Sequence, residues 1–109
     1  MSERKAFSLL GLAQKARAAA AGNFAVEQAV RAGTAKIVIV ASDASPNALR
    51  DISRITHYYN VPLVRFGTKE TLGHALGRQD RVTVAILADG LAEAFRKELP
   101  EDASVTEVI

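Results

Sequence analysis

The chain has 109 residues, an ordinary length for one self-sufficient core, and we expect residues 1–109 to form a single domain. Hydrophobic residues make up 49% and charged residues 24%, which excludes intrinsic disorder, and no apolar run is long enough to cross a bilayer. The absence of cysteine excludes disulfides, thiolate metal sites and cysteine nucleophiles. Charges interrupt the apolar positions of residues 1–22, unlike a secretion signal, so we expect a cytoplasmic protein.

The net charge of +2 is unevenly distributed along the chain. Residues 1–36 carry six Lys or Arg against two Glu, whereas residues 82–109 carry two basic against six acidic residues. A basic N-terminal half suits a polyanionic partner. Exposed Lys and Arg are more often solvated surface only, so charge alone does not identify the partner.

Two amphipathic helices and a buried strand are predicted in the first 41 residues. The first helix has an apolar stripe at helical spacing, formed by Phe7, Leu9, Leu10, Leu12 and Ala13. The alanine run 18–21 ends at Gly22-Asn23, which favours a turn, and a second helix then runs to a stop at Gly33. Residues 36–41 are β-branched and apolar without alternation, which predicts a central strand covered on both faces.

The rest of the chain alternates helices with short strands. Ser45 is the expected N-cap and Pro46 the first residue of a third helix that ends near Tyr58. Further elements are expected as strands at 61–66 and 82–87, a helix at 70–75 capped by Thr68, a helix at 91–99 stopped by Pro100, and an edge strand or frayed tail at 105–109. This order predicts the α/β class, as a three-layer α/β/α sandwich with a small parallel or mixed sheet.

The sequence lacks the usual signatures of catalysis and cofactor binding. His57 and His74 are far apart and belong to no metal-ligand spacing. No nucleophile elbow, phosphate-binding P-loop or dinucleotide fingerprint is present. Asp43 follows a predicted strand, but turn and capping roles explain it as well as catalysis does. We therefore expect no catalytic residue, no metal and no cofactor, and no small-molecule substrate or membrane as a partner.

The most suggestive local feature is Gly22-Asn23-Phe24, which opens a helix after a basic segment. A helix start presents unpaired N–H groups and a partial positive charge to an anion. Asn23 and Gln28 can hydrogen-bond phosphates or base edges. Charge is expected nearby from Lys15, Arg17, Arg31 and Lys36. The alternative is a plain turn into an amphipathic helix with a solvated outer face.

The loop 77–81 is a second basic candidate site, because Arg78 and Arg81 can clamp a nucleic-acid backbone. If the strands are parallel neighbours, the loops at one end of the sheet come together. Gly22 and Arg78 would then line a single face.

Four segments together resemble the kink-turn-binding ribosomal protein L7Ae family, and most closely its bacterial YlxQ/YbxF-like branch. They are LLGLAQKA at 9–16, the stretch 22–47, YYNVPL at 58–63, and 68–86 with its LGHALGR motif. The resemblance covers nearly the whole chain. It implies an α/β/α sandwich that binds kink-turn RNA, a sharply bent duplex whose sheared G·A pairs present guanine edges to the helix after the glycine turn.

The resemblance also identifies departures from the family pattern. The family's recognition stretch has Gly, a small residue, Asn, Glu, and then Lys three positions after the Glu; here these positions hold Gly22, Asn23, Phe24, Ala25 and Gln28. Gln28 can still hydrogen-bond a guanine edge, whereas Phe24 and Ala25 cannot replace Asn and Glu. The loop 77–81 is polar and basic where the family packs apolar residues on a flipped base, and it is one residue shorter. We expect backbone electrostatics, and therefore steep salt dependence, to dominate.

Three functions remain open at this point. The first is a non-catalytic, ribosome-associated protein that binds kink-turn RNA, ribosomal RNA or similarly bent RNA. The second is a protein-interaction module on the same fold that has lost kink-turn recognition, which an exposed Phe24 would favour. The third, an enzyme or small-molecule binder, rests only on fold analogy. Phe24 is a candidate RNA-binding residue, and the sequence leaves open whether it stacks on RNA or packs in the core. Composition favours the core position.

Overall fold

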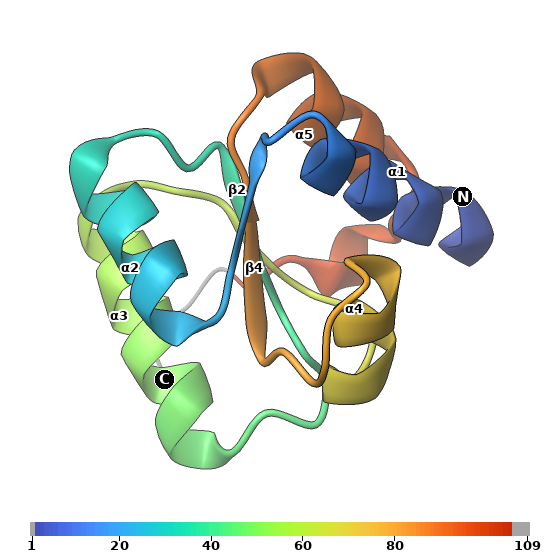
Figure 1. The fold of residues 1–109 in the computed structure, drawn as a ribbon. Helices are drawn as coiled ribbons and strands as arrows, with labels where there is room; N and C mark the ends of the chain where they lie inside the picture. Colours follow the sequence, from blue (N-terminus) through green and yellow to red (C-terminus); the bar gives the residue numbers. More distant parts are fainter. Residues whose placement is uncertain (1, 106–109) are drawn as a thin grey trace.

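The computed structural model describes residues 2–105 as five α-helices and a four-stranded sheet, followed by a short 3-10 helix (Figure 1). In chain order the elements are α1 (Glu3–Lys15), β1 (Ala19–Ala21), α2 (Asn23–Ala32), β2 (Ile37–Val40), α3 (Pro46–Tyr58), β3 (Leu63–Arg65), α4 (Lys69–Ala75), β4 (Thr83–Ile86), α5 (Asp89–Lys97) and the 3-10 turn Glu101–Ala103. Within the described residues, none of the helices has the length and apolar character that a membrane crossing requires.

The sheet is mixed, with strand order β1-β4-β2-β3. β4 pairs antiparallel with both β1 and β2, while β2 and β3 are parallel. The strands β1, β2 and β3 therefore run in one direction and β4 runs in the other. The central strands β2 and β4 are buried at every position, as predicted for β-branched runs covered on both faces.

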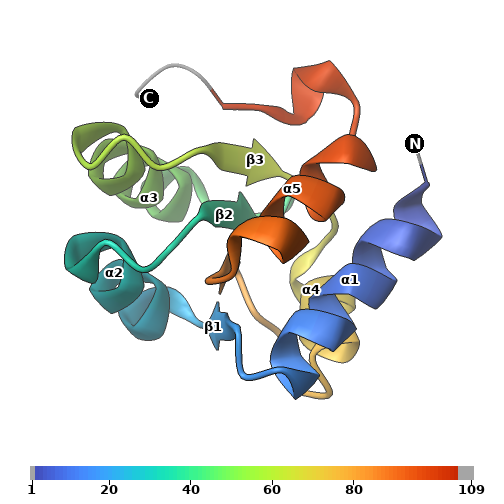
Figure 2. The same cartoon turned by 90° about the horizontal axis from the view of Figure 1, so that it is seen from above.

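Helices cover both faces of the sheet, which confirms the three-layer α/β/α sandwich. Figure 2 shows α2 and α3 on one face and α1, α4 and α5 on the other. Alternate side chains of β2 point to opposite faces of the sheet. Ile37 and Ile39 pack with residues of α1, α4 and α5, while Val38 and Val40 pack with residues of α2 and α3. Phe95 is the largest fully buried side chain.

Local capping chemistry sets several helix starts as predicted. The Ser45 hydroxyl accepts from the Ala48 N–H at 3.1 Å, Pro46 occupies the first turn, and α3 ends at Tyr58. Thr68 caps α4, and its side chain accepts from the Thr71 N–H at 3.1 Å. Asp43 also has a structural role, because its Oδ1 accepts from the Lys69 N–H at 2.9 Å and so holds the start of α4.

Two elements differ from the sequence prediction. The alanine run contains a strand, β1, which we did not predict because alanine has weak β propensity; pairing with β4 creates this strand. The last helix begins at Asp89 and ends at Lys97, whereas we expected it to run from Leu91 to Leu99. Its first turn takes in Asp89, whose carboxylate is favourable at the positive end of the helix dipole.

The chain returns to the sheet after the 3-10 turn. Ser104 forms an antiparallel bridge with Val64, and the Val105 N–H donates to the Leu63 carbonyl at 2.8 Å. The described chain therefore follows the outer edge of β3. The element expected at 105–109 lies outside the described residues beyond Val105.

Candidate nucleic-acid interface

The topology places three helix starts at one end of the sheet. Because β1, β2 and β3 run in the same direction, the helices that follow them, α2, α3 and α4, all begin where those strands end (Figure 1). β4 begins at the same end, after the loop 77–81. We call the start of α2 from Gly22 to Gln28, together with this loop, the Gly22 end.

Gly22 adopts a backbone conformation that only glycine tolerates, with φ 95° and ψ 155°. Its N–H donates to the Thr83 carbonyl at 2.9 Å, and its carbonyl accepts the first helical bond, from Val26, at 3.0 Å. No side chain caps α2, and its first turn contains no acidic residue. The backbone N–H groups of residues 23–25 therefore have no acceptor within the described chain, and the helix start presents unneutralised positive charge.

The side chain of Asn23 is oriented by a long-range hydrogen bond. The Thr83 Oγ1 donates to the Asn23 Oδ1 at 2.8 Å. Thr83 is almost fully buried, whereas Asn23 is exposed. The contact leaves the Asn23 Nδ2 donors without a partner in the described part of the chain, so they are available to an acceptor on a ligand.

Phe24 lies on the surface, with 75% of its area exposed, and the expected core position is wrong. The buried stripe of α2 consists of Val26, Ala29 and Val30, and a residue two positions before Val26 points away from that stripe. Gln28 is also exposed and lies one helical turn after Phe24 on the same face.

The loop 77–81 is hydrogen-bonded to both halves of α4. The Arg78 N–H donates to the Gly73 carbonyl at 2.8 Å, and the Arg81 N–H donates to the Lys69 carbonyl at 3.0 Å. The Arg81 Nη1 donates to the carbonyls of Gln79 and Asp80, at 3.2 and 2.9 Å. One arginine therefore organises the loop, while the exposed Arg78 guanidinium has no partner within residues 2–105.

The two candidate segments meet, although not by the predicted route. A Cβ built on Gly22 would lie 3.9 Å from the Arg81 Cδ. The predicted reason, parallel neighbouring strands, is wrong, because β1 and β4 are antiparallel neighbours. The antiparallel register continues with Gly22 opposite Thr83, the first residue of β4, and Arg81, two residues before Thr83, therefore lies beside Gly22.

Four of the predicted basic residues lie at the opposite end of the sheet. Lys15 and Arg17 precede Ala18, whose carbonyl accepts from the Leu87 N–H at 2.7 Å, beyond the last residue of β4. The Lys36 N–H donates to the Ile86 carbonyl at 2.8 Å. Arg31 lies in the last turn of α2, with its Nη2 3.5 Å from the Glu27 Oε1. We call these four residues the far-end cations, and the structure separates them from the Gly22 end.

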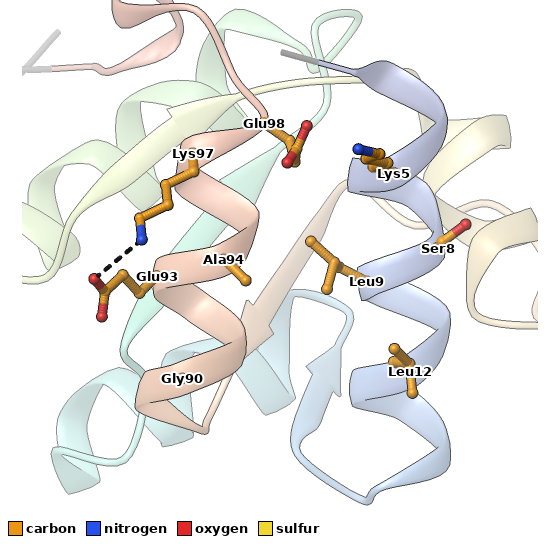
Figure 3. A pocket seen from close by; sticks show the side chains of 9 residues that line it. All are labelled: Lys5, Ser8, Leu9, Leu12, Gly90, Glu93, Ala94, Lys97 and Glu98. Carbon is orange, nitrogen blue, oxygen red and sulfur yellow. Dashed lines mark ion pairs between the residues drawn. The ribbon is translucent and has the colours of Figure 1, made fainter.

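A separate groove lies away from the Gly22 end. Figure 3 shows this open groove between α1 and α5, into which Leu9 and Ala94 point. Its volume is about 530 Å³. Lys5 and Glu98 lie near one of its ends. This groove belongs to the helical layer opposite α2. Within residues 2–105, no three His, Cys, Asp or Glu side chains come close enough to share a metal ion.

Sequence reasoning missed two residues that position the Gly22 end. Thr83 orients Asn23, but the two residues are 60 positions apart and no motif links them. Gly73 was interpreted only as part of a short helix. In the structure, a Cβ at Gly73 would overlap the Gln79 carbonyl, so the loop can approach α4 only because this residue is glycine.

Comparison with known proteins gives consistent matches along most of the chain. The model of the Ribosomal protein L7Ae/L30e/S12e/Gadd45 family matches residues 4–95. The RNA-binding protein YlxQ of Bacillus subtilis (strain 168) is 36% identical over 92 residues, covering 84% of this chain and 92% of that protein. The RNA-binding protein YlxQ of Enterococcus faecium is 32% identical over 100 residues, covering 92% and 95%.

Two solved structures share the fold. A protein of unknown function from Bacillus halodurans C superimposes with a TM-score of 0.82 at 31% identity, covering 86% of this chain and 95% of that one. The Giardia lamblia 15.5kD RNA binding protein gives a TM-score of 0.73 at 24% identity, covering 84% and 79%. The sequence and structure matches agree with the resemblance found in the sequence. The chain belongs to the Ribosomal protein L7Ae/L30e/S12e/Gadd45 family, in its YlxQ-like branch.

Proposed function

We propose that this protein acts as one domain that binds structured RNA through the Gly22 end and catalyses no reaction. The observation that carries the proposal is the position of Arg81 beside Gly22, which brings a basic loop next to an uncapped helix start. Family membership and the names of the curated relatives support RNA as the partner and the absence of catalysis. The preferred target is a kink-turn or a similarly bent duplex.

Phosphate recognition accounts for the affinity in this proposal. The free N–H groups at residues 23–25 are suited to a phosphate oxygen, as at other helix starts that bind anions. Arg78 and the unpaired donors of Arg81 add positive charge next to them. These contacts position the RNA without reading its sequence.

Base recognition falls to the side chains of Asn23 and Gln28. The Asn23 Nδ2 and the Gln28 amide can both hydrogen-bond the exposed edge of a guanine in a widened groove. The family pattern has Asn and Glu where this chain has Phe24 and Ala25, so base reading rests on fewer groups here. Phosphate contacts therefore supply most of the affinity, and the affinity for RNA falls steeply as the salt concentration rises.

We further propose that the RNA target is ribosomal and that the protein works in the cytoplasm. The ribosomal-protein description of the family supports this assignment. Co-sedimentation of the purified protein with purified ribosomal subunits on a sucrose gradient tests it directly. If the protein stays at the top of the gradient at low salt, the proposed ribosome association is wrong. That result does not bear on the proposed binding of other structured RNA.

The decisive experiment is titration of a fluorescent kink-turn RNA at two salt concentrations, with the same RNA carrying disrupted G·A pairs as control. We expect tight binding to the intact motif and much weaker binding to the control. Equal weak binding to both RNAs would refute kink-turn specificity. No binding to either RNA at low salt would refute the RNA interface at the Gly22 end.

One observation favours a second function, a protein-interaction module on the same fold. Phe24 is a large apolar side chain that is mostly exposed, and exposed aromatics are enriched at protein interfaces. In this alternative, Phe24→Ala abolishes a protein complex, and the wild-type protein binds the intact and the G·A-disrupted RNA equally weakly. The titration of these two RNAs with the wild-type protein therefore separates the two functions.

A further inference from the structure

We propose that Phe24 is a stacking platform for an unpaired base and that Gln28 hydrogen-bonds the edge of that base. This inference rests on the proposed RNA-binding function. It deepens that function by naming the feature selected in the target, a bent duplex that carries an unpaired nucleotide beside the bend. No matching family residue supplies this role, because the family pattern has Asn at this position.

The exposure of Phe24 stands out against the other phenylalanines. The chain has four, and the other three contact one another in and against the core. The ring centroids of Phe7 and Phe66 are 4.7 Å apart in a tilted pair, and those of Phe66 and Phe95 are 5.6 Å apart in an edge-to-face pair. Phe24 keeps 75% of its area in solvent at the start of α2. Core packing therefore does not account for an aromatic residue at this position.

The surroundings of Phe24 favour a nucleobase over a protein partner. At the Gly22 end, Phe24 shares the start of α2 with the polar Asn23 and Gln28, and the basic Arg81 lies beside Gly22. Among residues 2–105, the other exposed large apolar side chains lie elsewhere: Leu12 in the opposite helical layer, and Tyr58 and Tyr59 at the other end of α3. A single aromatic ring among cationic and polar groups is the composition of a base-stacking site, whereas protein hot spots have an apolar centre.

The spacing of Phe24 and Gln28 suits one nucleotide. Residues four positions apart lie on the same helix face, separated by about 6 Å along the axis. A base lying flat on the Phe24 ring therefore presents an edge to the Gln28 amide, which offers both a donor and an acceptor. Every base has an aromatic face, so the ring gives affinity and the amide gives discrimination.

The start of α2 also offers positive charge to the phosphate of the same nucleotide. The free N–H groups of residues 23–25 belong to Phe24 and to its two neighbours in the chain, and α2 has no acidic residue in its first turn. Glu27, the acidic residue of α2 nearest to this face, forms an ion pair with Arg31 at 3.5 Å. Arg81 supplies a cation beside Gly22. A phosphate next to the stacked base therefore meets positive charge.

The test uses one bent RNA duplex with a single unpaired nucleotide, and the same RNA with an abasic site at that position. Both are titrated with the wild-type protein and with Phe24→Ala, Phe24→Trp and Tyr58→Ala. Tyr58 is the matched control, since its ring is 79% exposed at the other end of the molecule. Substituting 2-aminopurine for the unpaired base gives a fluorescence readout of stacking. Thermal melting checks that each variant is folded.

We expect the wild-type protein to bind the intact RNA about 5- to 150-fold more tightly than the abasic RNA. Phe24→Ala removes this preference and the 2-aminopurine signal, Phe24→Trp retains both, and Tyr58→Ala behaves as wild type. Phe24→Ala binding both RNAs as the wild type does overturns the inference and assigns the ring to a protein contact. Failure of the wild-type protein to bind either RNA overturns the proposed function itself, and the two failures are thus distinguishable.

Discussion

Thr83 donates a hydrogen bond of 2.8 Å to Asn23, across 60 positions of sequence. The bond joins the first residue of β4 to the first residue of α2. Because β4 follows the loop 77–81 directly, the same contact sets the position of the helix start relative to the basic loop. The geometry of the Gly22 end therefore depends on a buried hydroxyl that touches no ligand.

Thr83→Val removes that hydroxyl while keeping the shape of the side chain. We expect the free energy of unfolding to fall by about 1 kcal/mol, the net value of one hydrogen bond. We expect RNA affinity to fall about two- to tenfold, since an unheld Asn23 side chain must be ordered on binding. Urea denaturation and RNA titration measure the two effects.

Thr83→Ser is the matched control, because it keeps the hydroxyl and loses only a methyl group. It should retain near-wild-type RNA affinity. If Thr83→Val and Thr83→Ser bind RNA equally well, the hydrogen bond to Asn23 does not contribute to the interface.

Gly22→Ala places a side chain at φ 95° and ψ 155°, a region essentially restricted to glycine. We expect a loss of about 2 kcal/mol in the free energy of unfolding and weaker RNA binding, because relief of the strain moves the start of α2. Gly33→Ala is the comparison, with φ 77° and ψ 14° at the other end of the same helix. It should cost about 1 kcal/mol and leave RNA affinity unchanged. Equal effects of the two substitutions on RNA affinity would show that the conformation of Gly22 has no special role.

Gly73→Ala introduces a methyl group that overlaps the Gln79 carbonyl, so the loop 77–81 must move. We expect a destabilisation of about 1–3 kcal/mol, typical of overpacking, together with reduced RNA affinity. Gly90→Ala is the control, because a Cβ there meets no atom within 4 Å, and we expect it to stabilise the protein by about 0.5–1 kcal/mol. Thermal melts and RNA titration check both variants. Unchanged RNA affinity in a folded Gly73→Ala protein would exclude the loop from the interface.

Arg78→Gln and Lys36→Gln distinguish the two ends of the sheet. The exposed guanidinium of Arg78 has no partner in the described chain, and we expect its removal to lower the slope of log affinity against log salt by about 0.9 in magnitude, the effect of one phosphate contact on a duplex. Lys36 lies among the far-end cations, and its substitution should leave the slope unchanged. RNA titrations at four salt concentrations provide the slopes. If Lys36→Gln lowers the slope and Arg78→Gln does not, the RNA interface lies at the far-end cations and not at the Gly22 end.

The elements that could be predicted from the sequence are those governed by local chemistry. Ser45 and Pro46 start α3 at the predicted place, and Gly33 ends α2 in the left-handed conformation that favours glycine. The β-branched runs became the central strands. β1 could not be predicted, because three alanines carry no strand signal and only pairing with β4 makes them one.

The sequence predicted the two segments of the candidate site, the start of α2 and the loop 77–81. It did not predict which other residues lie next to them. Helical periodicity located the start of α2, and glycine with arginine identified the loop 77–81. The basic residues that lie beside these two segments could not be predicted. The position of a charged residue in the sequence does not determine the end of the sheet at which its side chain lies. The structure places Arg81 beside Gly22 and puts Lys15, Arg17, Arg31 and Lys36 at the other end.

The sequence by itself determined the order of the five helices and of the strands β2, β3 and β4, the three layers and the family. These follow from periodicity, capping residues and motifs within short stretches of chain. Only the tertiary structure decided that β4 runs antiparallel to β1, that Thr83 holds Asn23, and that Phe24 lies in solvent. The physical reason is that strand pairing and burial are collective: each depends on which distant segments exclude water together, and no local pattern records that choice.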